Sequence, residues 1–533
     1  MFLNKVKDIR GDIFGGITAG IVALPMGLAF GIASGLGPLA GLYGAILVCF
    51  FASIFGGTAT QISGPTGPMT VVVASIVATH PNQAGLVFMS IFLAGIIQIL
   101  FGVLKTGKYV KYVPYPVISG FMSGIGVIII LLQINPFVGL PSMGTTIDSI
   151  QKFFTSFDMM NVQCLLIGTL TLLILFLTPK KISKKIPPIL IALISITALT
   201  YVLQLDVPKI GEIQRALPQF QLTAFDFKDF QIMLPIALTL ACLGSIDSLL
   251  TSIVADSLTK TKHNSNKELI GQGLGNMAAA MFGGIAGAGA TMRTVVNIKS
   301  GGNTRLSGVI HSLILVMILI CLAPLASQIP LAVLAAILIK VGFDIIDYKF
   351  IKVIKIAPKE DLIVMLIVFL ITVFDDLIFA VGVGIVLASI LFAINISKQI
   401  NVDVDEIEEC SVENGEKICD RNITVITIDG IFFFGSASQV ISRIENYLEK
   451  ECIILDCSRI TAMDISAVFA LEEIIIRLKD KKIRTILVLH DKEITLKLFK
   501  LGLLKLIGRN DITYNKKKAL EKIQKCNHKN NGE

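Results

Sequence analysis

Ile62-Ser63-Gly64-Pro65-Thr66-Gly67-Pro68-Met69 interrupts a chain that otherwise consists largely of long apolar runs, and Gly284-Ile285-Ala286-Gly287-Ala288-Gly289-Ala290-Thr291 interrupts it again. The two breaks occupy matching places in two halves, one after the run that opens near Phe14 and one after the run that opens near Ile232. Broken apolar segments at corresponding positions indicate a transporter binding site. Lipid tolerates unpaired backbone only where it faces protein or a water-filled cavity. We therefore expect the breaks to hold a solute.

The composition is that of a multi-pass membrane protein. The 533 residues are 53% hydrophobic, and the mean hydropathy of +0.77 excludes a soluble enzyme of this size. Apolar runs of about 17 to 24 residues recur from Phe14 to about Ser397, and each is long enough to cross ~30 Å of hydrocarbon. The polar, basic start of the chain leads directly into apolar spans, so no cleavable signal peptide is expected. We predict about fourteen crossings, two of them short.

Basic residues predict the orientation in the cell (inner) membrane. Loops expected inside are rich in lysine, whereas the loops expected outside, 133–161 and 206–230, hold few lysines. The positive-inside rule then places both the N-terminus and the C-terminal region in the cytoplasm, which requires an even number of spans. The same bias accounts for the net charge of +8, so the charge gives no reason to expect a nucleic-acid partner.

No residue pattern typical of an enzyme is present in the sequence. The nine cysteines are odd in number and lack a Cys-x-x-Cys spacing, which favours neither a disulfide framework nor zinc. The soluble part shows no nucleophile–base set and no phosphate-binding loop. We expect neither enzymatic activity nor an organic cofactor.

The chain divides into a membrane region, a linker and a soluble domain. Residues 1–228 and 229–400 are interpreted as two halves of seven spans each, and an odd number of spans per half makes the second half inverted. The acidic stretch 401–421 is predicted to be a linker, and residues 422–533 to be a cytosolic domain that ends in a disordered basic tail, 525–533. In this domain apolar strands alternate with helical patterns, which predicts a sheet covered by helices. The predicted strands are 423–428, 452–455 and 483–489, and the predicted helices lie near 437–449, 465–479 and 493–501.

Each break leads into a short helix, expected to start near Thr66 and near Ala290. A helix start exposes unpaired N–H groups and carries about half a positive charge. Two such starts that face one cavity from inverted halves form an anion site without lysine or arginine. Close helix packing is the alternative explanation for a glycine-rich turn, and the matched pair favours binding.

Asp247 lies near the middle of an apolar run, where a carboxylate costs at least ~2.5 kcal/mol. It must be protonated, paired with a basic side chain or paired with a bound cation. Thr251 lies one helical turn further on the same face, and carbonyl groups of 287–291 can add oxygen ligands. Hard cations prefer such oxygens, so the set favours sodium over a proton relay. Arg293 either adds positive potential to the anion cavity or pairs with Asp247, and the sequence leaves both open.

These motifs resemble the sulfate permease (SulP) family of anion transporters, over essentially the whole chain. The resemblance rests on Val22-Ala23-Leu24-Pro25, on Gly64-Pro65-Thr66-Gly67-Pro68-Met69-Thr70 and on the C-terminal α/β pattern. It implies a UraA-like fold of fourteen helices in two inverted seven-helix repeats, arranged as a core and a gate domain. It also implies a C-terminal STAS domain with a role in homodimer assembly and regulation.

Within the family, the sequence resembles the sodium-dependent bicarbonate transporters most. Carried onto matching positions, this resemblance implies sodium ligation by Asp247, Thr251, Gly289 and Thr291. It likewise implies bicarbonate contacts at Thr66 and Ala290. Other branches carry a different polar residue at the position of Asp247, and several are proton-coupled, so sodium depends on the local match. The stretches that carry the match are 246–251, 259–266, 268–273 and 287–294.

The STAS signature is matched by Ile454-Leu455-Asp456-Cys457-Ser458 and Met463-Asp464-Ile465-Ser466-Ala467. Ile465 and Ala467 stand where relatives often carry Ser or Thr and then Gly. Ser466 aligns with a serine that some relatives phosphorylate. We favour the simpler interpretation, that Ser466 only caps or starts a helix.

We expect a sodium:bicarbonate symporter that works by elevator-type alternating access. The first alternative is a proton- or sodium-coupled transporter of sulfate or another small oxyanion, because a helix start binds any compact anion. The second alternative is an anion channel or sensor that signals through the STAS domain. The pair Asp247 and Thr251 argues against a channel, because an uncoupled pore needs no coupling-ion site.

Overall fold

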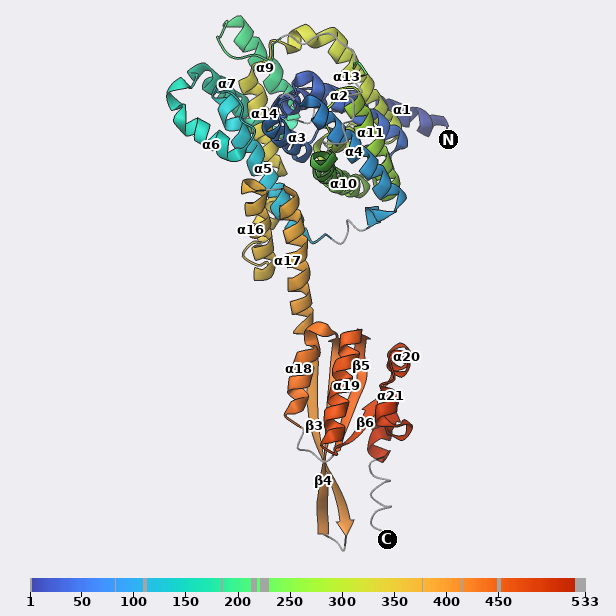
Figure 1. Cartoon of the computed structure of the whole chain (residues 1–533). Coiled ribbons are helices and arrows are strands. Elements are labelled where there is room, and N and C mark those ends of the chain that lie inside the picture. The colour runs from blue at the N-terminus through green and yellow to red at the C-terminus, as the bar shows by residue number, and fades with distance from the viewer. Residues whose placement is uncertain are drawn as a thin grey trace. The chain divides into compact units, whose positions relative to one another are not determined.

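The computed structural model in Figure 1 divides by its contacts into two compact units, Met1–Val386 and Leu387–Glu533. The division falls inside helix α17 (Leu377–Ser397). The predicted tail 525–533 lies outside the described residues. The residues that the structure describes are 2–81, 83–108, 113–183, 186–211, 218–220, 230–375, 377–413, 416–447 and 452–522.

The first unit is helical, with one short β-ladder. Up to residue 220 its described elements are α1 (Phe2–Ala33), α2 (Pro38–Phe55), β1 (Ser63–Gly64), α3 (Gly67–Thr79), α4 (Ala84–Val103), α5 (Tyr115–Phe137), α6 (Thr146–Thr155), α7 (Val162–Leu177), α8 (Lys180–Ser183) and α9 (Pro188–Val202). From residue 230 they are α10 (Phe230–Thr259), α11 (Ser265–Met281), β2 (Ala288–Gly289), α12 (Thr291–Lys299), α13 (Arg305–Ala326), α14 (Leu331–Ile345), α15 (Tyr348–Val353), α16 (Lys359–Phe374) and the start of α17.

The helices are those of a membrane protein, although the number of crossings stays a prediction. In the described part, 6 helices are long and apolar enough to span a bilayer. Four more are apolar but shorter, among them α3, α7 and α9. A helix of this length crosses only part of ~30 Å of hydrocarbon unless the flanking residues contribute.

The helices of the first unit pack in two groups. Helices α1, α2, α4, α10, α11 and α13 contact one another, and α5, α7, α14 and α16 form the second group. Glycine permits the closest approaches, as is usual between membrane helices. A Cβ atom at Gly41 of α2 would lie 1.9 Å from the carbonyl oxygen of Gly27 in α1. No other residue type fits there.

The two sequence breaks meet in space, because β1 and β2 pair antiparallel. Ser63 stands opposite Gly289, and Gly64 stands opposite Ala288. Each two-residue strand leads at once into a short helix, β1 into α3 and β2 into α12. The pairing therefore joins equivalent points of the two halves in opposite chain directions, as inverted halves require.

The second unit contains a five-stranded sheet in the order β3-β4-β5-β6-β7. The pair β3–β4 is antiparallel and the other pairs are parallel. Figure 1 shows α18 and α19 against these strands, and apolar residues such as Ile426, Leu455 and Leu471 are buried in the shared core. The strands are β3 (Asn401–Glu413), β4 (Glu416–Phe432), β5 (Cys452–Met463), β6 (Arg484–Val488) and β7 (Ile512–Thr513). The helices are α18 (Phe434–Glu445), α19 (Ile465–Asp480), α20 (Lys492–Lys500) and α21 (Leu504–Ile507).

The linker predicted at 401–421 is wrong for its described residues, which form β3 and the first part of β4. Val402 and Val404 face the core, whereas Asp403 and Asp405 are exposed. This is the period-2 alternation of a half-buried strand. Asp403 and Asp405 thus lie on the outer face of a sheet and not in a solvated connection.

Candidate ion-binding site

The two short helices begin where the sequence predicts. Thr66 precedes α3 and Ala290 precedes α12, both with extended backbone and with 8% of their surface exposed. Neither residue caps its helix with a side chain. The N–H groups of the first turns are therefore left to other acceptors, beside a β-ladder that holds the two helix starts together. This arrangement favours a negative charge between the starts.

Three of the four predicted cation ligands touch one another. The Thr251 hydroxyl on α10 donates to the carbonyl oxygen of Gly289 at 3.0 Å, and its Oγ1 lies 2.7 Å from Oγ1 of Thr291. Thr251 is fully buried. These contacts join α10 to the second break through oxygen atoms alone, the ligand type that hard cations prefer.

Asp247, the fourth predicted ligand, lies one turn before Thr251 on α10 and is 9% exposed. Among the described residues its carboxylate forms no ion pair, and its polar neighbours are the Thr66 hydroxyl and the Arg293 guanidinium. The Thr66 hydroxyl lies beside the carboxylate without a hydrogen bond of normal geometry, since its Oγ1 has no partner within the described chain. Asp247 thus lies beside the start of α3, and among the described residues no hydrogen bond joins its carboxylate to Thr251, Gly289 or Thr291.

Arg293 on α12 is 2% exposed and turns toward the first break. Its guanidinium donates through Nη2 to the carbonyl oxygen of Pro65, while Nη1 has no partner within the described part of the chain. It acts on Asp247 electrostatically without a direct ion pair. A buried positive charge therefore lies next to the start of α3, which adds to the potential that attracts an anion.

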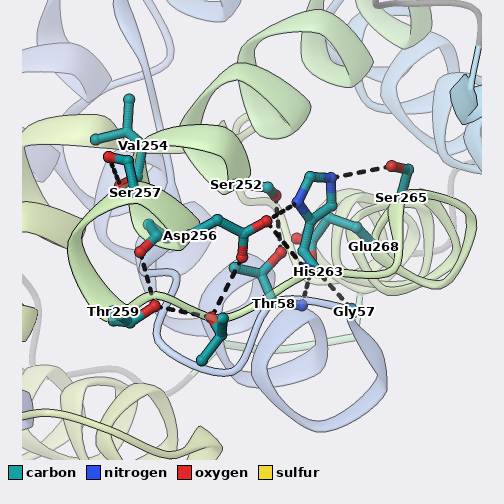
Figure 2. A network of polar contacts seen from close by, with 12 residues as sticks. Gly57, Thr58, Ser252, Val254, Asp256, Ser257, Thr259, His263, Ser265 and Glu268 are labelled. Atoms are coloured by element: carbon teal, nitrogen blue, oxygen red, sulfur yellow. Dashed lines mark hydrogen bonds and ion pairs between the residues drawn. The ribbon is translucent and has the colours of Figure 1, made fainter.

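A second buried carboxylate, Glu268 on α11, holds the loop before β1, and the sequence reasoning did not identify its role. Its Oε2 accepts from the backbone N–H groups of Gly57 and Thr58, each at 2.8 Å, as Figure 2 shows. Its Oε1 accepts from the side-chain amides of Gln61 at 2.9 Å and Gln272 at 2.8 Å. These four donors compensate the buried charge. The sequence signal is an acid, Glu268, one turn before Gln272 in a helix that is otherwise rich in glycine and alanine.

Side chains of α10 and α11 fix the second break from both sides. Asn276 accepts from the N–H of Gly287 at 2.8 Å and donates to its carbonyl oxygen at 3.0 Å. Ser248 accepts from the N–H of Gly289 at 3.0 Å. A Cβ atom at Gly289 would lie 2.2 Å from the Gln61 amide nitrogen, so a side chain there would displace the amide that donates to Glu268. The backbone of the break is therefore held rigid.

The turn between α10 and α11 carries a polar chain that runs through His263 (Figure 2). Its Nδ1 lies 2.7 Å from Oδ2 of Asp256, and its Nε2 lies 2.9 Å from Oγ of Ser265. The backbone N–H of His263 donates to the same Asp256 oxygen at 3.0 Å. These contacts close the turn. The stretch 259–266 therefore stabilises the connection between α10 and α11.

The STAS-like signature of the second unit forms the end of β5 and the start of α19. Asp464 caps α19 by accepting from the N–H of Ala467 at 2.8 Å. Ser466 is exposed in the first turn, so it starts the helix without capping it. Burial and the Asp456 carboxylate raise the pKa of the Cys457 thiol to about 12, which leaves it protonated and unreactive.

Comparison with known proteins gives the following matches. A sequence profile of the sulfate permease family matches residues 9–368, and a profile of the STAS domain matches 416–519. The bicarbonate transporter BicA of Picosynechococcus is 43% identical, with 97% of this chain and 95% of BicA covered.

Solved structures extend these matches. The transmembrane domain of a cyanobacterial BicA is 48% identical, with a TM-score of 0.64 and coverage of 72% of this chain and 97% of that domain. The murine anion transporter Slc26a9 in its inward-facing state is 18% identical, with a TM-score of 0.84, 97% of this chain and 91% of that chain covered, which shows a shared fold.

Proposed function

This chain belongs to the sulfate permease family, and we propose that within the family it is a sodium-coupled bicarbonate symporter. The observation that carries the proposal is the meeting of two helix starts with a cluster of buried oxygens on α10 and the second break. The helix starts provide the anion site, and the oxygens provide the cation site. The relatives named BicA support bicarbonate as the anion.

Sodium fits the donor set of the proposed cation site. Asp247 supplies the negative charge, and Thr251, Gly289 and Thr291 supply neutral oxygens that already lie in contact. No sulfur or imidazole is among these residues, which disfavours transition metals. The bound ion would supply one positive charge that cancels the Asp247 carboxylate. The helix starts at Thr66 and Ala290 would then attract bicarbonate without opposition from a buried negative charge.

Transport follows from the coupling of the two ions. Without the cation, Asp247 repels an anion at the start of α3, so the anion binds well only after the cation. We propose an elevator-type movement in which the group with α1, α2, α10 and α11 shifts against the group with α5 and α14. The second unit would lie in the cytoplasm, as would the N-terminus, and would contribute to a homodimer.

The test is uptake of labelled bicarbonate by purified full-length protein in vesicles, started by a jump in external sodium. We expect Asp247→Asn to abolish the sodium-driven component while the protein remains folded in the membrane. Asp158→Asn, the same change at an exposed position in a short 3-10 helix, serves as the control. Wild-type uptake that is equal in potassium-only buffer would contradict the proposal.

Uptake measurements in the same vesicles distinguish a bicarbonate carrier from the main alternative, a carrier of sulfate or another small oxyanion. The helix starts bind any compact anion, so the anion must be measured directly. Excess sulfate that abolishes bicarbonate uptake, together with faster uptake of labelled sulfate, would favour the alternative. Electrogenic flux far above carrier turnover would favour a channel.

A further inference from the structure

A small cavity lies between the two helix groups, one turn along α3 from the proposed anion site. It is bounded by α1, α3, α5 and α14, and its wall begins at Gly67, the first residue of α3. Thr70 donates its backbone N–H to the carbonyl oxygen of Thr66 at 2.9 Å, so the cavity and the helix start share one turn. The space available to the centre of a water molecule is about 10 Å³, which is room for one water.

Two polar side chains, Thr70 and Gln133, line this otherwise apolar cavity, and neither forms a side-chain hydrogen bond among the described residues. Thr70 is 4% exposed, and its hydroxyl oxygen is buried with no hydrogen-bond partner among the described residues. Gln133 on α5 is 6% exposed, and no hydrogen bond within the described chain involves its amide. The remaining wall includes Ile129, Leu132 and Leu338. An unpaired buried polar group is costly, so the Thr70 hydroxyl beside the Gln133 amide favours a polar molecule in this cavity.

The cavity lies at the contact between α3 and α5, which we call the seam. This contact must open if the two helix groups move against each other. Thr70 belongs to α3, which begins at the ion site, whereas Gln133 belongs to the facing helix α5 of the second group. Separation of α3 from α5 would widen the space from one water to an anion. We propose that this seam is part of the anion route and that Thr70 and Gln133 are its polar contacts, with Gln133 selecting bicarbonate over sulfate. The inference rests on the proposed transport function.

The selectivity follows from the chemistry of the primary amide. Gln133 offers N–H donors and one carbonyl acceptor, and Thr70 offers a hydroxyl. Bicarbonate has oxygens that accept these donors and one O–H that donates to the amide carbonyl. Sulfate has no proton to donate near neutral pH, so the amide carbonyl would face oxygen lone pairs. Its second charge would also lose water against apolar walls. A site built to pair with a substrate hydroxyl rejects an analogue that lacks it.

The experiment measures labelled bicarbonate uptake under a sodium gradient in vesicles with the full-length protein, with sulfate as competitor. We expect Gln133→Leu, which keeps the volume and removes the amide, to raise KM for bicarbonate about tenfold and to make sulfate about tenfold more inhibitory. The sodium concentration for half-maximal uptake should not change. Thr70→Val should raise KM for bicarbonate by less, and Thr70→Ser should restore the wild-type value.

The control for the chemical change is Gln151→Leu on the exposed face of α6, which should behave as wild type. A Gln133→Leu variant with wild-type KM and wild-type sulfate inhibition would overturn the inference while leaving the proposed function intact. Failure of the proposed function gives a different result, since the wild-type protein itself would then show no sodium-driven bicarbonate uptake.

Discussion

The two breaks differ in what their surroundings offer to a bound ion. In the second break, side chains of α10 and α11 satisfy the backbone of Gly287 and Gly289, and hydroxyl and carbonyl oxygens gather around Thr251. In the first break, Pro65 receives a guanidinium donor, and the Thr66 hydroxyl has no partner among the described residues. Two breaks with equivalent backbone positions therefore carry different side-chain chemistry. On the proposed function, the oxygens around Thr251 in the second break would bind the cation, and the first break would contribute mainly to the anion site.

The largest expected effect concerns Glu268, which anchors the loop into the first break. Glu268→Ala leaves four neutral N–H donors without their acceptor in a buried place, and each unpaired donor costs about 1–3 kcal/mol, so we expect a strong loss of folded protein. Glu268→Gln keeps part of the acceptor set and should lose less. The measurement is the thermal stability of purified protein by size-exclusion after heating. Equal stability of the alanine variant and the wild type would show that the first break needs no such anchor.

A smaller effect is expected at Asn276, the anchor of the second break. Asn276→Ala removes both hydrogen bonds to Gly287 and should destabilise the protein by about 1–3 kcal/mol. Because Gly289 follows two residues later, the concentration of sodium for half-maximal uptake should also rise. The control is Asn401→Ala at an exposed position of β3. A variant that loses bicarbonate affinity at saturating sodium would contradict the division of roles.

A further test replaces one threonine of each site by valine, Thr251 beside the second break and Thr66 in the first break. Thr251→Val should raise the half-maximal sodium concentration about tenfold, the equivalent of about 1.4 kcal/mol, with KM for bicarbonate unchanged at saturating sodium. Thr66→Val should have the opposite pattern, with a rise of KM for bicarbonate of a few fold, because the helix N–H groups remain. Uptake kinetics at varied sodium and varied bicarbonate distinguish the two. Identical patterns in both variants would remove the distinction between the breaks.

The sequence predicts the parts of the site that depend on local spacing. Asp247 and Thr251 are four residues apart on a helix, so their common face follows from helical periodicity alone. The helix starts follow from the glycine- and proline-rich breaks. The strand at 401–413 was also predictable, because Val402 and Val404 alternate with acidic residues, but its acidity was interpreted as a linker.

Other features depend on contacts that have no local pattern. The pairing of Gly64 with Ala288 involves strands of two residues, which are too short for a period-2 signal. The donors to Glu268 include Gly57 and Thr58, more than two hundred positions away in the chain. Gln133 is one of many polar residues in apolar runs, and only the cavity around it gives it a role. Long-range packing decides such cases.

The ladder between β1 and β2 has a consequence for how the cargo is carried. Because β1 and β2 pair directly before α3 and α12, the N-terminus of one helix cannot move without the N-terminus of the other. On the proposed function, the cation and the anion would therefore move together, because the two helix starts beside which they bind move as one body.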